Sequence, residues 1–465
     1  MKCVVLGATG YLGSRLVPEL LAAGHTVRAA ARTPGKLADA PWRDDAELVT
    51  ADVTEPGQVA AALTGQDVAY YLVHSLHRSD FVERDRAAAH TVAREARRAG
   101  LRRIIYLGGI SPTGQRLSPH LASRAEVGSI LLGSGVPTVV LRAAVVLGSG
   151  SASFEMLRYL TERLPAMVTP RWVGTRVQPI AVRDVLYYLT QAAERVPDAV
   201  SRGFDIGGPE VLTYRAMMRR YAAVAGLPRR AVIPVPLLTP WLSAQWVNLV
   251  TPVPRSIAVP LISSLVHEVV CHDHDIAAYI PDPPGGLTGF DEAVKLARAR
   301  TRERGAPSPA PRAAPGSRTR ARTGPPSDPL PTDPAWSGGT VYQDTRELAT
   351  AADAARLWRA IEDAGTGSHD HRALPGRWNV DDVEWPRRLR LRGAARRPGR
   401  VWLELSATAA PGGSVYRQRA VFEPRGLFGQ LLWTALTPVR RPALDRLAHG
   451  ITRTAERSVP VGQPW

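Results

Sequence analysis

The sequence predicts an α/β fold with a doubly wound parallel sheet over its first 300 residues, followed by a second domain of α+β type. Short runs of Val, Ile and Leu alternate with amphipathic helical patterns in the first part, as expected when helices connect parallel strands. Residues 301–339 are then rich in Pro, Arg, Ser and Gly and contain little that a core could bury. The predicted domains are therefore 1–300 and 340–460, joined by a disordered linker over 301–339.

Apolar runs bounded by turn residues indicate six strands in the first domain. They are Lys2–Leu6, Thr26–Ala31, Ala46–Thr50, Val68–Leu72, Arg103–Leu107 and Thr138–Arg142. Helical patterns cover Tyr11–Ala23 and Asp85–Ala99, and Gly24 and Gly100 follow them where a left-handed residue commonly ends a helix. In the second domain the patterns predict a strand at 340–344, a helix at 351–363, strands near 386–394, 401–409 and 414–423, and a long helix over 427–457 that breaks near Pro438.

Cysteine content and charge narrow the class of protein. Only Cys3 and Cys271 occur, which excludes a disulfide framework and fits a reducing, cytoplasmic location. Met1 runs directly into an apolar strand pattern, so we expect no signal peptide. The net charge of +17 comes from arginines spread along the chain, without a basic stripe interleaved with aromatic residues. We therefore expect no specific nucleic-acid partner.

The first strand leads into a glycine-rich turn from which a helix starts. The turn reads GATGYLG over residues 7–13. Its glycines allow a tight turn, close approach of backbone amides to a diphosphate, and close packing of helix on strand, as in Rossmann-type domains. The helix N-terminus adds free N–H groups and a partial positive charge. The residues expected to bind a dinucleotide here are Gly7, Thr9, Gly10, Tyr11, Leu12 and Gly13.

The end of the second strand bears on which dinucleotide is bound. NAD sites usually have an acid at this point, whereas an arginine suits the 2′-phosphate of NADP. The segment VRAAAR ends on Arg32 and contains no acid, so NADP(H) is favoured and NAD(H) remains the alternative. Arg28 or Lys36 is expected to assist Arg32; the competing interpretation is that Arg32 is simply solvated.

Two further strand ends contribute candidate cofactor contacts, because ligands of open α/β sheets bind at the carboxyl ends of the strands. Asp52 and Val53 follow the third strand, where a side chain reaches the adenine. Val73, His74 and Ser75 follow the fourth strand, which lines the nicotinamide ribose in this topology.

Several segments in order resemble the atypical short-chain dehydrogenase/reductase proteins, and among these the NmrA-like and complex I 39-kDa-subunit-like NAD(P)-binding proteins. They are GATGYLG, the ADV after the third strand, YYLVHS, IIYLGG, the run from LGSGSASFEML to QPIAVRDV, and FDIGGPEVLTYRAMMRRYA. The resemblance covers roughly residues 1–300. It implies an NAD(P)-binding fold and, for active members, hydride-transfer chemistry.

The second domain resembles the uncharacterised domain often fused behind such proteins, with FEPRGLFGQLLW at 422–433 as its signature. Its strand–helix–strands–long-helix order is similar to the helix-grip fold, which encloses an apolar ligand in other families. A plain packing domain is the alternative.

The catalytic pair that this superfamily usually has is replaced in this chain. The resemblance implies Tyr-x-x-x-Lys with an upstream Ser, in which the tyrosine gives a proton to the carbonyl. Ser111 is present, but His120 and Arg124 stand where the pair is expected. These three are our candidate catalytic residues, with His120 as an acid near neutral pH and Arg124 holding the ribose or a phosphate.

Two other segments attract attention. The run HEVVCHDHD at 267–275 has metal-ligand residue types but lacks a second cluster with zinc spacing, so we expect a helix end with polar surface residues and no metal.

The uncharged stretch 231–254 contains five prolines, which would break a membrane-spanning helix. We expect an apolar wall or lid over the cofactor, with peripheral contact to a membrane or a hydrophobic partner as the alternative.

The sequence therefore supports two functions. The first is an NADPH-dependent oxidoreductase acting on a hydrophobic carbonyl, enone or quinone-like small molecule. The second is an NADP(H)-bound redox sensor or assembly protein without turnover, which contacts a protein partner through the C-terminal domain. Loss of the Tyr and Lys favours the second, whereas the long apolar segment favours the first.

Overall fold

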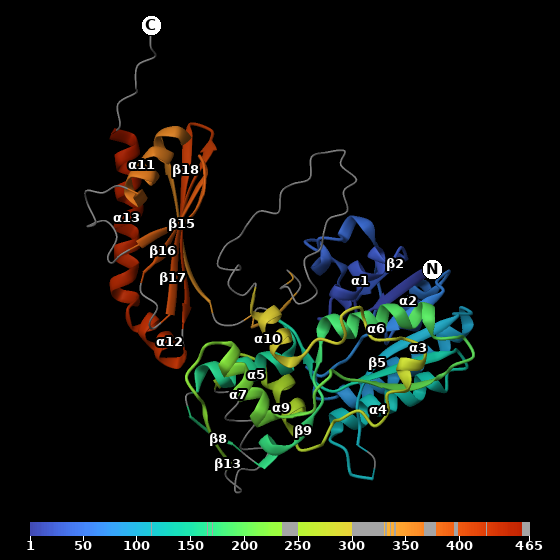
Figure 1. Ribbon diagram of the computed structural model, residues 1–465. Helices are drawn as coiled ribbons and strands as arrows, with labels where there is room; N and C mark the ends of the chain where they lie inside the picture. Colours follow the sequence, from blue (N-terminus) through green and yellow to red (C-terminus); the bar gives the residue numbers. More distant parts are fainter. Residues whose placement is uncertain are drawn as a thin grey trace. The chain divides into compact units, whose positions relative to one another are not determined.

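The computed structural model describes most of the chain. The described residues are 1–112, 114–164, 166–169, 171–234, 250–299, 330, 333–334, 336–338, 341–366, 378–394, 399–424 and 426–457. Contacts divide them into two units, the first ending at Gly338 and the second beginning at Val341. Figure 1 shows both units, coloured along the sequence.

A seven-stranded parallel sheet with the order β11-β6-β5-β4-β1-β2-β3 forms the centre of the first unit. The strands are β1 (Lys2–Leu6), β2 (Thr26–Ala31), β3 (Glu47–Thr50), β4 (Val68–Tyr71), β5 (Arg103–Gly109), β6 (Thr138–Ala143) and β11 (Arg202–Ile206). The predicted fold class and all six predicted strands are confirmed. The edge strand β11 was not predicted from the sequence, where only Phe204 and Ile206 interrupt a polar stretch.

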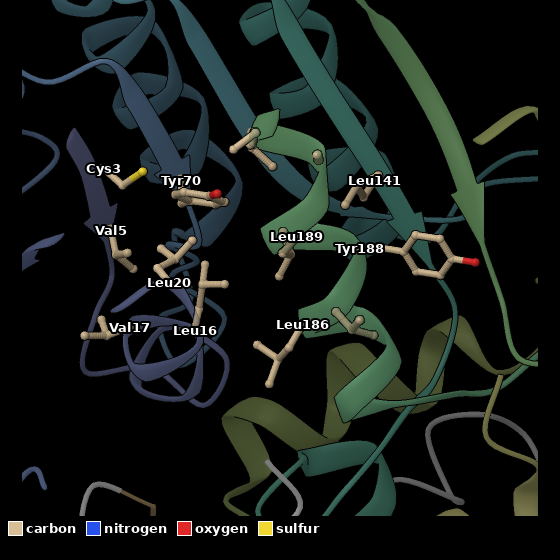
Figure 2. Close-up of a cluster of buried hydrophobic side chains, with 14 of the residues drawn as sticks. Cys3, Val5, Leu16, Val17, Leu20, Tyr70, Leu141, Leu186, Tyr188 and Leu189 are labelled. Carbon is tan, nitrogen blue, oxygen red and sulfur yellow. The ribbon is translucent and has the colours of Figure 1, made fainter. Parts of the chain in front are cut away.

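Helices cover both faces of this sheet, because alternate residues of each strand point to opposite sides. On one face α1 (Gly13–Ala22) and α6 (Val182–Arg195) pack against side chains such as Val5 and Tyr70, as Figure 2 shows. On the other face, α2 (Pro56–Leu63), α3 (Phe81–Arg98) and α4 (Pro119–Leu132) pack against the alternate residues of the same strands. The glycines after α1 and α3, Gly24 and Gly100, have φ of +86° and +67°, as predicted.

A second core in the first unit is formed by helices and short strand pairs that follow β6. The helices are α5 (Ala152–Arg163), α7 (Tyr214–Val224), α9 (Arg255–Ser264) and α10 (Phe290–Ala299). The short strands are β7 (Val146–Leu147), β8 (Ala166–Thr169), β9 (Arg176–Val177), β10 (Ile180–Ala181), β12 (Leu212–Thr213) and β13 (Ala231–Pro234). Elsewhere along the first unit as well as here, the described residues form 3₁₀ turns at Pro34–Leu37, Arg43–Asp45, Arg171–Gly174 and Asp275–Ala278.

The end of the predicted linker is ordered against the first unit, which corrects the expectation of a disordered tether up to residue 339. Asp333 accepts two hydrogen bonds of 2.7 Å from Arg15 of α1, and both side chains are almost fully buried. Glu155 at the start of α5 accepts from the backbone N–H of Gly338 at 3.0 Å, and Trp336 accepts from the Tyr159 hydroxyl at 2.8 Å. A buried arginine and a buried glutamate account for this order, because each needs partners that α1 and α5 do not supply alone.

The second unit is a five-stranded antiparallel sheet with the order β14-β18-β17-β16-β15. Its strands are β14 (Tyr342–Thr350), β15 (Trp378–Glu384), β16 (Arg388–Gly393), β17 (Gly399–Ala410) and β18 (Gly413–Pro424). Its helices are α11 (Ala354–Thr366), α12 (Gly426–Ala435) and α13 (Thr437–Arg457), of which α11 and α13 pack on one face of the sheet. The acid-rich edge strand β15 was not predicted. The predicted helix break is confirmed at Leu436, two residues before Pro438.

Among the described residues, we find no helix that is both long and apolar enough to cross a membrane.

We predict that Asp333→Asn destabilises the first unit by about 3–5 kcal/mol, because it removes the carboxylate charge that pairs with the buried Arg15 guanidinium. Amide hydrogen exchange of the full chain, measured by mass spectrometry, should be faster in peptides from α1 and α5 of the variant. Glu126→Gln, which breaks the half-exposed Arg86–Glu126 pair, is the matched control and should cost only about 0–1 kcal/mol. Equal exchange in the wild type and the Asp333 variant would contradict the structural role of the pair.

Candidate functional site

The glycine turn after β1 depends on two close backbone approaches. Gly7 has φ of +93°, and Gly10 N–H donates to the Gly7 carbonyl at 2.9 Å. A Cβ on Gly13 would lie 2.3 Å from that same carbonyl oxygen, so only glycine lets α1 begin there. The arrangement directs the N-terminus of α1 at the carboxyl edge of the sheet, where backbone N–H groups and the helix dipole favour a diphosphate.

Tyr11 contributes to the turn by packing. Its side chain is partly buried against the first core, and its hydroxyl would lie 2.2 Å from a Cβ placed on Gly148. The Arg15 guanidinium lies 4.2 Å from the centre of the Tyr11 ring and donates to the Tyr11 carbonyl at 3.1 Å. Burial raises the pKa of Tyr11, so its side chain stays neutral. The expected cofactor contact of Tyr11 is therefore assigned to its backbone.

We predict that Gly13→Ala disrupts the turn, because the added methyl meets backbone atoms of Gly7 and Ala8 that cannot move independently of β1. Dinucleotide affinity measured by calorimetry should fall by at least tenfold. Gly57→Ala, at a helical position with open space around the new Cβ, is the control and should bind as the wild type does. Wild-type affinity in the Gly13 variant would exclude this turn as the diphosphate site.

Arg32 and Asp52 lie close together at the ends of β2 and β3. Burial raises the pKa of Asp52, but hydrogen bonds from Thr54 and the charges of Arg32 and Arg84 outweigh it, so the pKa is lowered overall. Arg32 is exposed, as a phosphate ligand must be before binding. Arg84, on α3, was missed from the sequence because the β4–α3 connection gave no indication that α3 reaches this edge.

Arg28 cannot assist Arg32, which corrects one of the two expected helpers. Its guanidinium donates to Glu47 at 2.8 Å and to the carbonyl of Ala62 at 2.9 Å, on the side of β2 that faces α2. The other expected helper, Lys36, is exposed in the turn after β2.

At the opposite end of the site, His74, His120 and Arg124 are within electrostatic reach of one another. The surrounding protein disfavours a charged His74 ring, and the Arg124 charge adds to this, so the pKa of His74 falls to about 3. The same two causes lower the pKa of His120 to about 3. The lowered pKa values favour neutral imidazoles beside the Arg124 cation, and they do so more clearly for the half-buried His120 than for His74, whose side chain is exposed to solvent.

His120 is held by α9, an element far away in the sequence. The Ser264 hydroxyl lies 3.2 Å from His120 Nδ1, 2.8 Å from the Ser118 hydroxyl and 2.9 Å from the Pro260 carbonyl, to which it can donate. This cluster of hydroxyls fixes the Nδ1 side of the His120 ring. The lowered pKa of His120 disfavours the expected role of an acid near neutral pH, and that role stays a prediction.

Arg124 is anchored by groups under the strand ends. It donates to the Tyr106 hydroxyl at 3.4 Å, and Tyr106 donates to the Arg124 carbonyl at 3.3 Å. Asp85 of α3 is buried within reach of this charge; burial raises its pKa, while hydrogen bonds from Ser75 and the Arg124 charge oppose the rise. Asp85 was missed from the sequence, although an acid at a position of α3 that faces the core was a usable signal. Tyr106 is fully buried and cannot replace the missing tyrosine.

The remaining sequence candidates are divided between this site and other contacts. Val53 is buried, Val73 and Ser75 are half-buried at the ends of β3 and β4, and the Ser111 hydroxyl is buried without a hydrogen-bond partner among the described residues. In the 267–275 run, His267 accepts from Ser118 N–H and His272 donates to Asp205, so the segment is not the predicted helix end. The described residues contain no group of three metal-ligand side chains. Most of the predicted lid, residues 235–249, lies outside the described residues.

We predict a pH-dependent stability from His120. The folded state leaves it unprotonated down to about pH 3, whereas the unfolded chain protonates it near its ordinary value of 6.5. The free energy of unfolding should therefore be highest above pH 6.5 and fall as the pH drops from there toward 3. His120→Gln should flatten this slope in urea titrations at several pH values, while His449→Gln on the surface of α13 should not. An unchanged slope in the His120 variant would contradict the neutral ring.

Comparisons with known proteins agree with this geometry. Residues 7–132 match the family model described as NAD(P)H-binding. The first unit contains an NAD(P)H-binding domain. Residues 378–445 match a family described as a protein of unknown function, DUF2867.

Curated relatives match about half of the chain. A putative dihydroflavonol 4-reductase of Synechocystis is 25% identical over 296 residues, which is 55% of this chain and 82% of that protein. An uncharacterized protein of Mycobacterium tuberculosis is 28% identical over 229 residues, 49% of this chain and 24% of that protein. The chain thus spans about a quarter of the length of the first curated relatives that it matches.

Solved structures show the same fold. The NADPH-dependent quinone oxidoreductase of Escherichia coli, in complex with NADPH, superposes with a TM-score of 0.52 at 17% identity over 63% of this chain and 99% of that chain. The triphenylmethane reductase of Citrobacter gives a TM-score of 0.52 at 19% identity over 63% of this chain and 98% of that chain. The first unit therefore shares the fold of these two proteins. The helix-grip comparison for the second unit stays a prediction.

Proposed function

We propose that the protein is an NADPH-dependent oxidoreductase that reduces a hydrophobic carbonyl, enone or quinone-like substrate. The observation that carries the proposal is Arg124, a cation held by Tyr106 within electrostatic reach of His74 and His120 at the carboxyl edge of the sheet. Hydride addition to such substrates leaves negative charge on an oxygen, and a positioned cation lowers the energy of that charge. The two solved proteins named above are a quinone oxidoreductase and a triphenylmethane reductase.

The reduced nicotinamide, when bound, supplies the hydride. Arg124 then stabilises the developing oxyanion, with its guanidinium kept in place by Tyr106 and by the charge of Asp85. Because His74 and His120 are neutral, neither is an imidazolium that could donate to this oxygen at pH 7, and the proton comes from water. In the reverse direction, the neutral His120 ring has one unprotonated nitrogen that can accept the proton of an alcohol or hydroquinone. Ser111 is proposed to orient the substrate oxygen.

We predict that Arg124→Gln lowers the turnover number about 10²-fold while the Kd for NADPH changes little, because the charge acts on the transition state. Arg94→Gln on the outer side of α3 is the matched control. Turnover is followed by loss of reduced-nicotinamide absorbance with quinones, enones and aldehydes. Unchanged turnover in the Arg124 variant would remove it from the reaction.

The preference for NADP(H) is proposed from Arg32 and Arg84, whose charges act on Asp52 at the adenine end. Arg32→Asp should raise the Kd for NADPH by at least tenfold and leave the Kd for NADH within a few-fold, because only NADPH carries the 2′-phosphate. Both constants are measured by calorimetry. An unchanged ratio of the two would contradict the assignment.

The second candidate function is an NADP(H)-bound sensor or assembly protein. The observation that favours it is the contact of Asp333 with Arg15, since a segment that leads into the second unit is fixed on the nucleotide-binding helix. In this proposal the second unit contacts a protein partner or, if it has a helix-grip fold, holds an apolar ligand. Tight NADPH binding without oxidation by any substrate class would favour this function over the enzyme.

A further inference from the structure

The second unit exposes a cluster of large apolar side chains. Among the described residues of the whole chain, nine large apolar side chains are exposed, and four of them lie between residues 428 and 439. Phe428 and Leu431 are 70% and 61% exposed on α12, and Leu436 and Val439 are 44% and 66% exposed where α13 begins. We call these four residues the α12 ridge. Apolar side chains are normally buried when a protein folds. A cluster of exposed ones therefore indicates a surface that a membrane or another molecule covers.

The ridge is not a frayed end, because the opposite side of α12 is fixed to the sheet. Trp433 stacks on Phe422 of β18 with ring centres 4.4 Å apart, and Gly429 is buried. Residues 429 and 433 are one helical turn apart and share the inner side of the helix. Phe428 and Leu431 are three residues apart, so they share the outer side of the helix. Figure 1 shows α12 at one end of the sheet of this unit.

The charges beside the ridge are mostly positive. The ten residues of α12, GLFGQLLWTA, contain no charged side chain. Arg440 stacks on Trp433 at 3.8 Å, and the neighbouring Arg441 is 66% exposed. The α13 segment holds five arginines against Asp445 and Glu456, and the half-buried Asp344 lies within 4.0 Å of both Arg440 and Arg441. An apolar ridge flanked by arginines fits an anionic surface.

We propose that the α12 ridge docks on an anionic lipid bilayer. Phe428, Leu431 and Val439 would enter the boundary between headgroups and acyl chains, while Arg441 and the exposed Arg446 would contact lipid phosphates. A second copy of this chain fits less well, because it would bring the same arginines against one another and the whole chain carries a net charge of +17. Docking would place a reductase of hydrophobic substrates at the membrane, in which such substrates dissolve. The docking itself does not depend on the proposed reaction.

The test is co-sedimentation of the full chain with vesicles of phosphatidylcholine alone, or of phosphatidylcholine mixed with an equal amount of phosphatidylglycerol. We expect binding to the mixed vesicles and at least tenfold weaker binding to phosphatidylcholine. The double variant Phe428→Glu, Leu431→Glu should lose the binding, because it replaces inserting groups by anions. Val380→Glu, Val383→Glu on β15 is the matched control, since these valines are 48% and 46% exposed in the same unit and lie outside the ridge.

Arg441→Gln should weaken binding to the mixed vesicles several-fold, and added salt should have a similar effect. A polarity-sensitive fluorophore on Leu431→Cys should shift to the blue on mixed vesicles, and one on Val383→Cys should not. The proposal is overturned if the wild type does not bind, or if the ridge variant binds like the control. It is also overturned if the ridge variant only changes the oligomeric state in light scattering, which would assign the ridge to a second copy.

Discussion

The contact on which the first unit depends is the approach of Gly13 to the carbonyl oxygen of Gly7. A side chain at position 13 would place its Cβ 2.3 Å from that oxygen, which is closer than atoms can come. Because no Cβ is present, α1 starts immediately above β1 and its N-terminus faces the edge where all seven parallel strands end. The free amides and the dipole of that helix are what make this edge attractive to a diphosphate. The positions of Arg32, His74 and Arg124 along the same edge follow from the sheet that this contact orients.

Buried charge organises the region around the turn. Arg15 lies in the first turn of α1, and its charge is balanced by Asp333, 318 residues further along the chain. Glu155 likewise takes hydrogen bonds from the backbone of both Gly150 and Gly338. Breaking one partner of such a pair costs much more than an exposed ion pair contributes. The nucleotide-binding unit is therefore complete only with the short segment that ends at Gly338.

The chemistry of the site follows from which groups remain charged. Usual members of the superfamily to which this chain shows a resemblance place a tyrosine and a lysine here, so that a proton donor and a cation act together. In this chain Arg124 stands where the lysine is expected, and the pKa values of His74 and His120 are lowered. A site of this composition can stabilise an oxyanion but does not supply an imidazolium, which suits substrates whose reduced form tolerates negative charge. The exposed α12 ridge lies in the other unit. Its proposed role is to place the protein on a membrane, and it takes no part in the reaction.

The sequence by itself determined the parallel sheet, the glycine turn and the order of the strands along the chain, because hydrophobic period and glycine position are local properties. It also singled out Arg32, His120 and Arg124 as candidates, since each follows a recognisable strand or opens a recognisable helix. It did not reveal Asp85 beneath Arg124, Ser264 on His120, Asp333 on Arg15, or the engagement of Arg28 by Glu47. Those are pairings between residues distant in sequence, and only the packing of the elements decides which buried polar group meets which partner. The protonation of the two histidines was decided in the same way, because the pKa of a ring depends on its three-dimensional surroundings and not on its neighbours along the chain.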